Sequence, residues 1–157
     1  DFCLSRGLGD VYKRQAENLG RTVAGMPIPA VDFDEIDAME PVSFERWALS
    51  RCIGIGWNAS RTPRSHDGGA DGVLVHRVSD AIAIVQCKHK RKVTDPCGPD
   101  AIDDLLRARA NYPGSARLFV LTNSKKFDRT TIERAERHGI SLIGRSDLVH
   151  WPSQLTC

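Results

Sequence analysis

The chain has 157 residues, of which 41% are hydrophobic and 27% are charged, and this balance is that of a globular domain with one hydrophobic core. It excludes a large multidomain assembly, and the longest apolar run, residues 81–85, is far shorter than the roughly 18 to 20 residues of a membrane-spanning helix. The formal charge of +2 neither requires nor excludes a polyanionic partner, so the distribution of charge must decide.

The first 38 residues differ in character from the rest. Residues 1–15 lack helical or strand periodicity, and residues 10–15 (DVYKRQ) resemble a translated adapter from sequencing libraries. We interpret residues 1–15 as a non-native scar, the alternative being a natural segment without regular structure. If it is a scar, an upstream specificity domain or membrane domain could be missing. Residues 16–38, rich in Gly, Pro and acidic side chains, are expected to form a linker or arm, followed by the folded domain at 39–152 and a tail at 153–157.

Hydrophobic periodicity predicts the elements of the folded domain. Apolar residues three to four apart follow Ser43, which can cap a helix over 44–53 that Gly54 and Gly56 end. Three strands are predicted next, over 57–62, 71–77 and 81–88. They are followed by a helix over 100–110, a strand over 116–121, a helix over 129–138 and a strand over 140–143. A final turn is predicted with Ser146 as its cap. The order α-β-β-β-α-β-α-β predicts an α/β fold with a mixed β-sheet covered by helices on both faces.

Polar side chains gather at one end of the hairpin predicted through residues 78–80. Asp71 begins one strand, and Gln86 and Lys88 end the other on a shared face, because side chains alternate along a strand. If paired residue numbers add to an odd number such as 157 or 159, Asp71 faces the same way as Gln86 and Lys88. An even sum would separate Asp71 from them, unless a bulge restores the facing.

These residue types suit the hydrolysis of a phosphodiester with a divalent cation. Mg²⁺ prefers oxygen ligands, and the side chains of Asp71 and Gln86 and the backbone carbonyl of Cys87 can supply them. Lys88 can orient or help to deprotonate the attacking water while it stabilises the phosphate. The alternatives are that Asp71 only forms a turn beside its glycines and that Lys88 is a solvated residue at a strand end.

Lys88 also begins a run of five basic or histidine residues, and clustered Lys and Arg bind DNA by releasing its counterions. We predict DNA contacts from Lys90, Arg91 and Lys92, the alternative being a solvated surface. Further DNA contacts are predicted from Arg64, Ser65, His66, Asn123 and Ser124. For the last two, a turn with capping side chains is the alternative, and His66 can equally be an exposed loop residue.

Six segments in a fixed order resemble one known family. They are FERW (44–47), GW (56–57), TPRSHDGGADG (62–72), VQCK (85–88), LTNSKKF (121–127) and HGISLIGRSDL (138–148). Over about residues 39–151 the chain is similar to the Mrr-like restriction endonucleases of the PD-(D/E)xK nuclease superfamily. The resemblance implies a restriction-endonuclease-like fold in which Asp71 is the motif carboxylate, Gln86 takes the D/E position and Lys88 is the motif lysine.

The same resemblance assigns Glu45 to the acidic residue of the opening helix, where it would act on the metal through water or on a second ion. Its alternative is an ordinary acid in the first turn of a helix. Gln86 makes the motif a QxK variant that departs from the wider superfamily and leaves the number of metal ions open.

The sequence thus predicts a Mg²⁺-dependent DNA endonuclease, with Mn²⁺ as an alternative ion, that forms the cleavage domain of a restriction or defence protein. A catalytically weak DNA-binding module and a structure-specific nuclease similar to Holliday-junction resolvases stay open. Cutting of both strands predicts a homodimer on DNA. Five cysteines without a CxxC pair favour reduced thiols and a cytoplasmic location.

Overall fold

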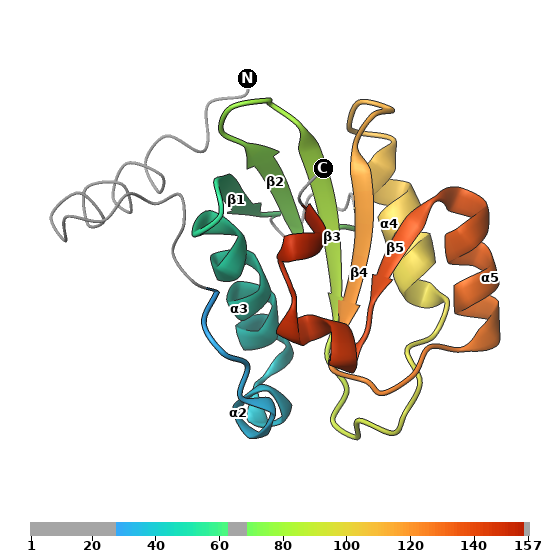
Figure 1. Cartoon of the computed structure of the whole chain (residues 1–157). Helices are drawn as coiled ribbons and strands as arrows, with labels where there is room; N and C mark the ends of the chain where they lie inside the picture. The colour runs from blue at the N-terminus through green and yellow to red at the C-terminus, as the bar shows by residue number, and fades with distance from the viewer. Residues whose placement is uncertain (1–27, 63–68, 156–157) are drawn as a thin grey trace, which may run out of the picture.

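The computed structural model of the chain describes residues 28–62 and 69–155. In chain order the elements are α2 (Phe33–Ala38), α3 (Pro41–Ile53), β1 (Trp57–Arg61), β2 (Gly72–His76), β3 (Ile82–Lys88), α4 (Asp100–Arg109), β4 (Arg117–Thr122), α5 (Arg129–His138), β5 (Ile140–Ile143) and the 3-10 turns η1 (Arg145–Val149) and η2 (Ser153–Leu155) (Figure 1). From α3 to β5 this is the predicted order. Within the described ranges, no helix has the length and apolar character needed to cross a membrane.

The strands form one mixed sheet, as predicted, and their order in the sheet is β1-β2-β3-β4-β5. β1, β2 and β3 are antiparallel neighbours, whereas β3, β4 and β5 run parallel. The two halves meet at β3, in which every residue from Ala83 to Cys87 is buried. Asp80, with a φ of 56°, lies in the turn between β2 and β3, where Asp is one of the few residues besides Gly that tolerate this conformation.

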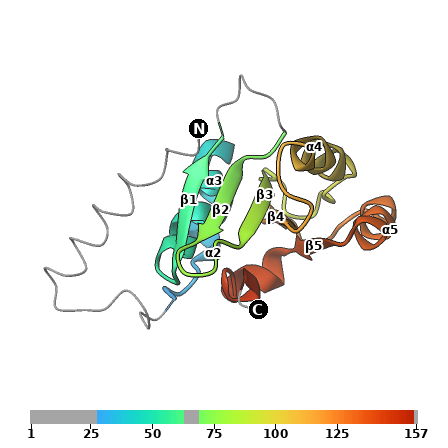
Figure 2. The same cartoon turned by 90° about the horizontal axis from the view of Figure 1, so that it is seen from above.

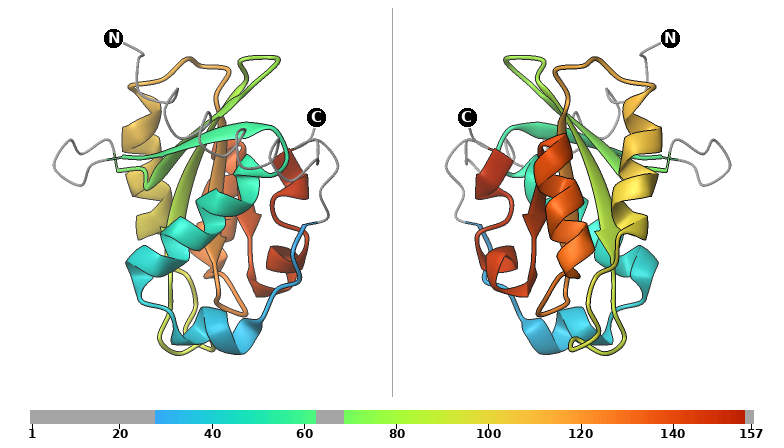
Figure 3. Two further views of the ribbon diagram at one scale, coloured as in Figure 1. Left: turned by 90° about the vertical axis from the view of Figure 1, so that its left-hand side faces the viewer. Right: turned by 90° about the vertical axis from the view of Figure 1, so that its right-hand side faces the viewer.

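Two hydrophobic clusters fill opposite faces of the sheet. On one face, α3 and the C-terminal residues Leu148 and Trp151 pack against β2, β3 and β4. On the other face, α4 and α5 pack around Ile84 and Val120. Figure 2 shows the strands side by side, and Figure 3 shows α4 and the C-terminal 3-10 turns on opposite sides of them. The prediction of a sheet covered on both faces is confirmed.

Two predicted caps, Ser43 and Ser146, are wrong. α3 begins at Pro41 with Glu40 as its N-cap, so Ser43 lies inside the helix. Proline suits the first helical position because its missing N–H would have no partner there. η1 likewise begins after Gly144, whose N–H donates to the side chain of Asp147 (3.1 Å), so Ser146 is not the cap.

The packed domain also extends beyond the expected limits at both ends. α2 lies inside the segment expected to be an arm, and its Ile36 is only 1% exposed in the core against α3. Asp37 accepts two hydrogen bonds from the guanidinium of Arg145 (2.6 and 2.8 Å), which fasten α2 to η1. In the expected tail, Leu155 is also 1% exposed. Ile36 of α2 and Leu155 therefore belong to the core of the domain.

Candidate active site

Asp71 lies at the open end of the β2–β3 hairpin. Gly72 pairs with Val85, so paired residue numbers add to 157, which is the odd register that puts Asp71 across from Gln86. The ladder ends in a bulge-like step, because the N–H of Asp71 donates to the Val85 carbonyl (3.0 Å) that already faces Gly72. Beyond this step the Asp71 carboxylate accepts a hydrogen bond from the N–H of Cys87 (2.7 Å). This bond fixes the carboxylate beside the end of β3.

Burial raises the pKa of Asp71 to about 6. The hydrogen bond from the N–H of Cys87 lowers this pKa, and the negative charge of Glu45 raises it. Smaller effects come from the ammonium of Lys88, which lowers the pKa, and from the charge of Asp104, which raises it. A carboxylate that ionises reluctantly for these reasons is stabilised strongly when a cation approaches it.

Gln86 turns away from α3 and toward the α4 side of the sheet. Its neighbours Val85 and Cys87 pack in the cluster with α3, and the alternation of side chains directs Gln86 and Lys88 to the other face. Gln86 is 5% exposed, and its Oε1 has no hydrogen-bond donor among the described residues. Because an unpaired buried acceptor costs about 1 to 3 kcal/mol, this oxygen is suited to receive a cation.

The available metal ligands at this end of the hairpin are oxygens. Within residues 28–62 and 69–155, no three His, Cys, Asp or Glu side chains form a metal-binding cluster. The donor set is instead the carboxylate of Asp71, the orphaned Oε1 of Gln86 and the carbonyl of Cys87. Oxygen donors of this kind fit a hard cation such as Mg²⁺.

Glu45 approaches the site from α3. The residue is buried, and its Oε2 lies 3.0 Å from Nη2 of Arg61 on β1. Its charge is close enough to raise the pKa of Asp71. The structure thus brings the two predicted acids into electrostatic contact, while the action of Glu45 on a metal stays a prediction.

The ammonium of Lys88 is held by two carboxylates that sequence reasoning missed. Its Nζ lies 2.8 Å from Oδ2 of Asp104 and 3.0 Å from Oδ2 of Asp100, both on α4. Burial alone would lower the pKa of Lys88, but the hydrogen bonds that its ammonium donates to these two carboxylates, together with their negative charge, outweigh burial and raise it. The available signal was the spacing of four residues, which places both acids on one face of the helix that follows β3.

The basic residues that follow β3 lie on a loop supported from inside by β4. Arg91 and Lys92 are exposed, and Lys90 is half-buried. The buried Asn123 accepts a hydrogen bond from the N–H of Lys90 (2.7 Å) and donates to its carbonyl (2.9 Å). Ser124, also buried, donates to another carbonyl of the same loop (2.6 Å). Asn123 and Ser124 therefore shape the basic loop from within, which is a supporting role that the sequence did not predict.

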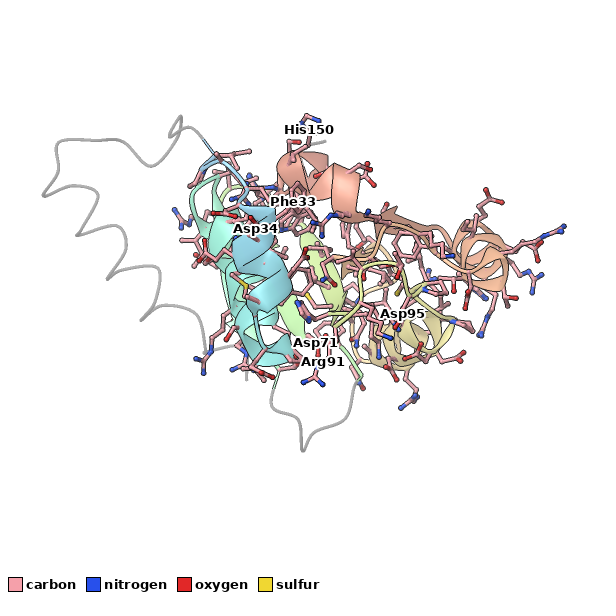
Figure 4. The ribbon with its side chains drawn as sticks, turned by 90° about the horizontal axis from the view of Figure 1, so that it is seen from below. Phe33, Asp34, Asp71, Arg91, Asp95 and His150 are labelled. Atoms are coloured by element: carbon pink, nitrogen blue, oxygen red, sulfur yellow. The ribbon has the colours of Figure 1, made fainter. Side chains whose placement is uncertain are left out.

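The predicted residues thus converge at the carboxyl ends of β3 and β4. Figure 4 views the domain from below, where Asp71 and Arg91 appear at this end of the hairpin. Arg64, Ser65 and His66 lie outside the described residues. The arrangement joins a set of oxygens that could hold a cation, a fixed ammonium and an exposed basic loop.

Known proteins that are similar to this chain indicate its family. A family model described as a restriction endonuclease matches residues 36–152. No curated protein matches the chain.

Three solved structures are similar at low identity. A repair endonuclease from Pyrococcus abyssi has 15% identity and a TM-score of 0.46, over 65% of this chain and 44% of that chain. A protein of unknown function has 16% identity and a TM-score of 0.45, over 78% and 60% of the two chains. The MspJI restriction endonuclease in complex with a 27-mer oligonucleotide has 17% identity and a TM-score of 0.41, over 92% of this chain and 30% of that chain. This chain spans less than two thirds of the length of each.

Proposed function

The chain belongs to a family of restriction endonucleases, and from this premise we propose that its nuclease domain hydrolyses phosphodiester bonds in DNA with the help of a divalent cation. Mg²⁺ is the proposed ion and Mn²⁺ an alternative. The observation that carries the proposal is the buried Oε1 of Gln86, which has no hydrogen-bond partner in the described part of the chain, at the hairpin end where the Asp71 carboxylate is fixed. Two such oxygens with a neighbouring ammonium suit the charge that phosphodiester hydrolysis develops.

Each residue of the set has a distinct task in this proposal. Asp71 and Gln86 hold the cation, with the Cys87 carbonyl as a third oxygen, and Glu45 adds negative charge from the α3 side. A bound cation supplies positive charge to the phosphate and lowers the pKa of the attacking water. Lys88 presents a protonated ammonium that stabilises the same developing charge.

The basic loop is the proposed DNA-binding surface. Arg91 and Lys92 are exposed within four residues of Lys88, where they can contact backbone phosphates without reading bases. Arg64, Ser65 and His66 stay predicted contacts. We further propose that the domain is the cleavage part of a cytoplasmic defence protein and that two copies act together on DNA to cut both strands.

The test is cleavage of supercoiled plasmid with Mg²⁺, with Mn²⁺ or with EDTA. The matched control is Asp80→Asn, because Asp80 is exposed in the β2–β3 turn, in a conformation that Asn also tolerates. Asp71→Asn and Lys88→Met should each lower the rate by about 100-fold or more, whereas the control should cleave like the wild type. Equal nicking by all variants, or nicking in EDTA, would contradict the proposal.

Two further measurements separate the alternatives. DNA retention in a gel shift without cleavage in any ion would favour a binding module. Cleavage of a four-way junction but not of a plasmid would favour a structure-specific nuclease.

A further inference from the structure

Asp104 on α4 binds the ammonium of Lys88 in the candidate active site. We propose that Asp104 is a positioning residue that fixes the ammonium of Lys88 as a stationary positive charge at the cleavage site, an inference that rests on the proposed nuclease function. Its Oδ2 lies 2.8 Å from Nζ of Lys88, and its Oδ1 accepts a hydrogen bond from Arg107 (2.9 Å). Both oxygens of the carboxylate are therefore engaged, and the acid has a defined orientation.

Asp100 binds the same ammonium but is less well fixed. Its side chain is 68% exposed, compared with 26% for Asp104. An exposed ion pair is weakened by solvent, whereas a partly buried pair is screened less. Asp104 is thus the main restraint on Lys88.

The backbone around Asp104 is also packed against the segment that leads to Asp71. Gly69, with a φ of 80°, lies so close to the backbone of Asp104 that a Cβ would not fit. The charge of Asp104 acts on Asp71 as well, because it contributes to the raised pKa of that acid. One turn of α4 therefore contacts both the lysine of the site and the chain just before its carboxylate.

Removal of the Asp104 carboxylate would release the flexible side chain of Lys88 next to Asp71, whose pKa is raised. The charge of Lys88 already reaches Asp71, so an ammonium freed from α4 can pair with the carboxylate that is proposed to hold the cation. By holding Lys88 on the α4 side, Asp104 keeps the ammonium at the phosphate position and leaves Asp71 open.

The first test compares Asp104→Asn with Asp103→Asn. Asp103 is the adjacent residue of the same helix, but it pairs with Arg134 of α5 rather than with Lys88. We expect Asp104→Asn to lower kcat by about 10-fold or more, because a small displacement of a catalytic group is costly, and to leave KM within about two-fold. Asp104→Glu, which can still pair with Lys88, should recover part of the rate, and Asp103→Asn should retain it.

An unchanged or increased kcat in Asp104→Asn would overturn the inference while the nuclease function stands. Equal losses in the Asp103 and Asp104 variants, without recovery by Asp104→Glu, would also overturn it, since that pattern indicates a general effect on α4. Circular dichroism melting of each variant confirms that the fold is retained.

A second test does not depend on cleavage. Nitrogen-15 relaxation of lysine NH₃⁺ groups reports how rigidly each ammonium is held, and Lys88→Arg identifies the Lys88 signal. The Lys88 signal should be ordered in the wild type and in Asp103→Asn, and as mobile as that of the exposed Lys92 in Asp104→Asn. A signal that stays ordered in Asp104→Asn overturns the inference. Loss of order in a protein that cleaves no DNA would contradict the proposed function but keep the restraint.

Discussion

The buried carboxylate of Asp71 is expected to destabilise the metal-free protein at neutral pH. Its pKa is raised from 3.8 to about 6, chiefly because burial disfavours the charged form. Between these values the folded protein keeps a proton that the unfolded chain has lost, so the free energy of unfolding falls as pH rises through this range. The contribution of the neutral acid is fully present below the lower value and is lost once pH exceeds the higher one.

Asp71→Asn removes this charge, and its side-chain oxygen can still accept the N–H of Cys87. A pKa raised from 3.8 to about 6 corresponds to about 3 kcal/mol. Because Asp71 is only partly buried, screening by solvent reduces the expected gain to about 1 to 2 kcal/mol. We therefore expect the variant to be more stable than the wild type by this amount near pH 8, and by about a quarter of it or less near pH 4.

Urea denaturation in EDTA, followed by the fluorescence of the buried Trp57 and Trp151, measures the difference. Asp80→Asn in the exposed β2–β3 turn is the control and should change the unfolding free energy by less than about 0.5 kcal/mol. A gain of equal size at both pH values, or no gain near pH 8, would refute the desolvation argument. Added Mg²⁺ should stabilise the wild type but not Asp71→Asn, since binding to the folded state alone raises its stability.

Three further substitutions have defined outcomes. Ile36→Ala leaves a cavity beneath α2 and should lower the unfolding free energy by about 2 to 4 kcal/mol in urea; an unchanged midpoint would place α2 outside the core. Gly72→Ala brings a Cβ within 2.5 Å of the Leu49 side chain, so it should lower the free energy of unfolding by about 1 to 3 kcal/mol. This loss should be smaller in a Leu49→Ala background, whereas additive losses would contradict the clash. Replacing Arg91 and Lys92 by Gln should reduce the salt slope of DNA binding by about 2 in a filter-binding titration, and an unchanged slope would argue against phosphate contacts.

Elements bounded by local signals were predictable from the sequence. α5 and β5 have their predicted bounds because Gly139, with a φ of 66°, ends the helix through backbone bonds to its last turn. The register of the hairpin stayed open between an odd and an even sum in the sequence, and the pairing of Gly72 with Val85 shows the odd sum. At the end of α5, in contrast, a few neighbouring residues determine the local structure.

Features that depend on contacts between distant residues were not predictable. α2 has six residues, too few for a stable isolated helix, and it is held by the burial of Ile36 and by the pairing of Asp37 with Arg145, 108 residues later. Similarly, the acids of α4 have the pattern of a solvated helix face. Only the packing of α4 on the parallel half of the sheet makes Asp104 a partner of Lys88.

Gln86, whose Oε1 has no donor among the residues that the structure describes, and the carboxylates of α4 both affect the balance of charge around Asp71. An acid as buried as Asp71 is most simply stabilised by the nearest ammonium, and Lys88 is near enough for its charge to lower the pKa of Asp71. Asp104 binds that ammonium instead, at 2.8 Å, while Gln86 offers a neutral oxygen that cannot compete for it. Asp71 and Gln86 consequently keep acceptor capacity that no described side-chain donor fills, and a single cation would satisfy both oxygens. On this argument the site depends on α4 as much as on the hairpin, because α4 prevents the lysine from neutralising the acid.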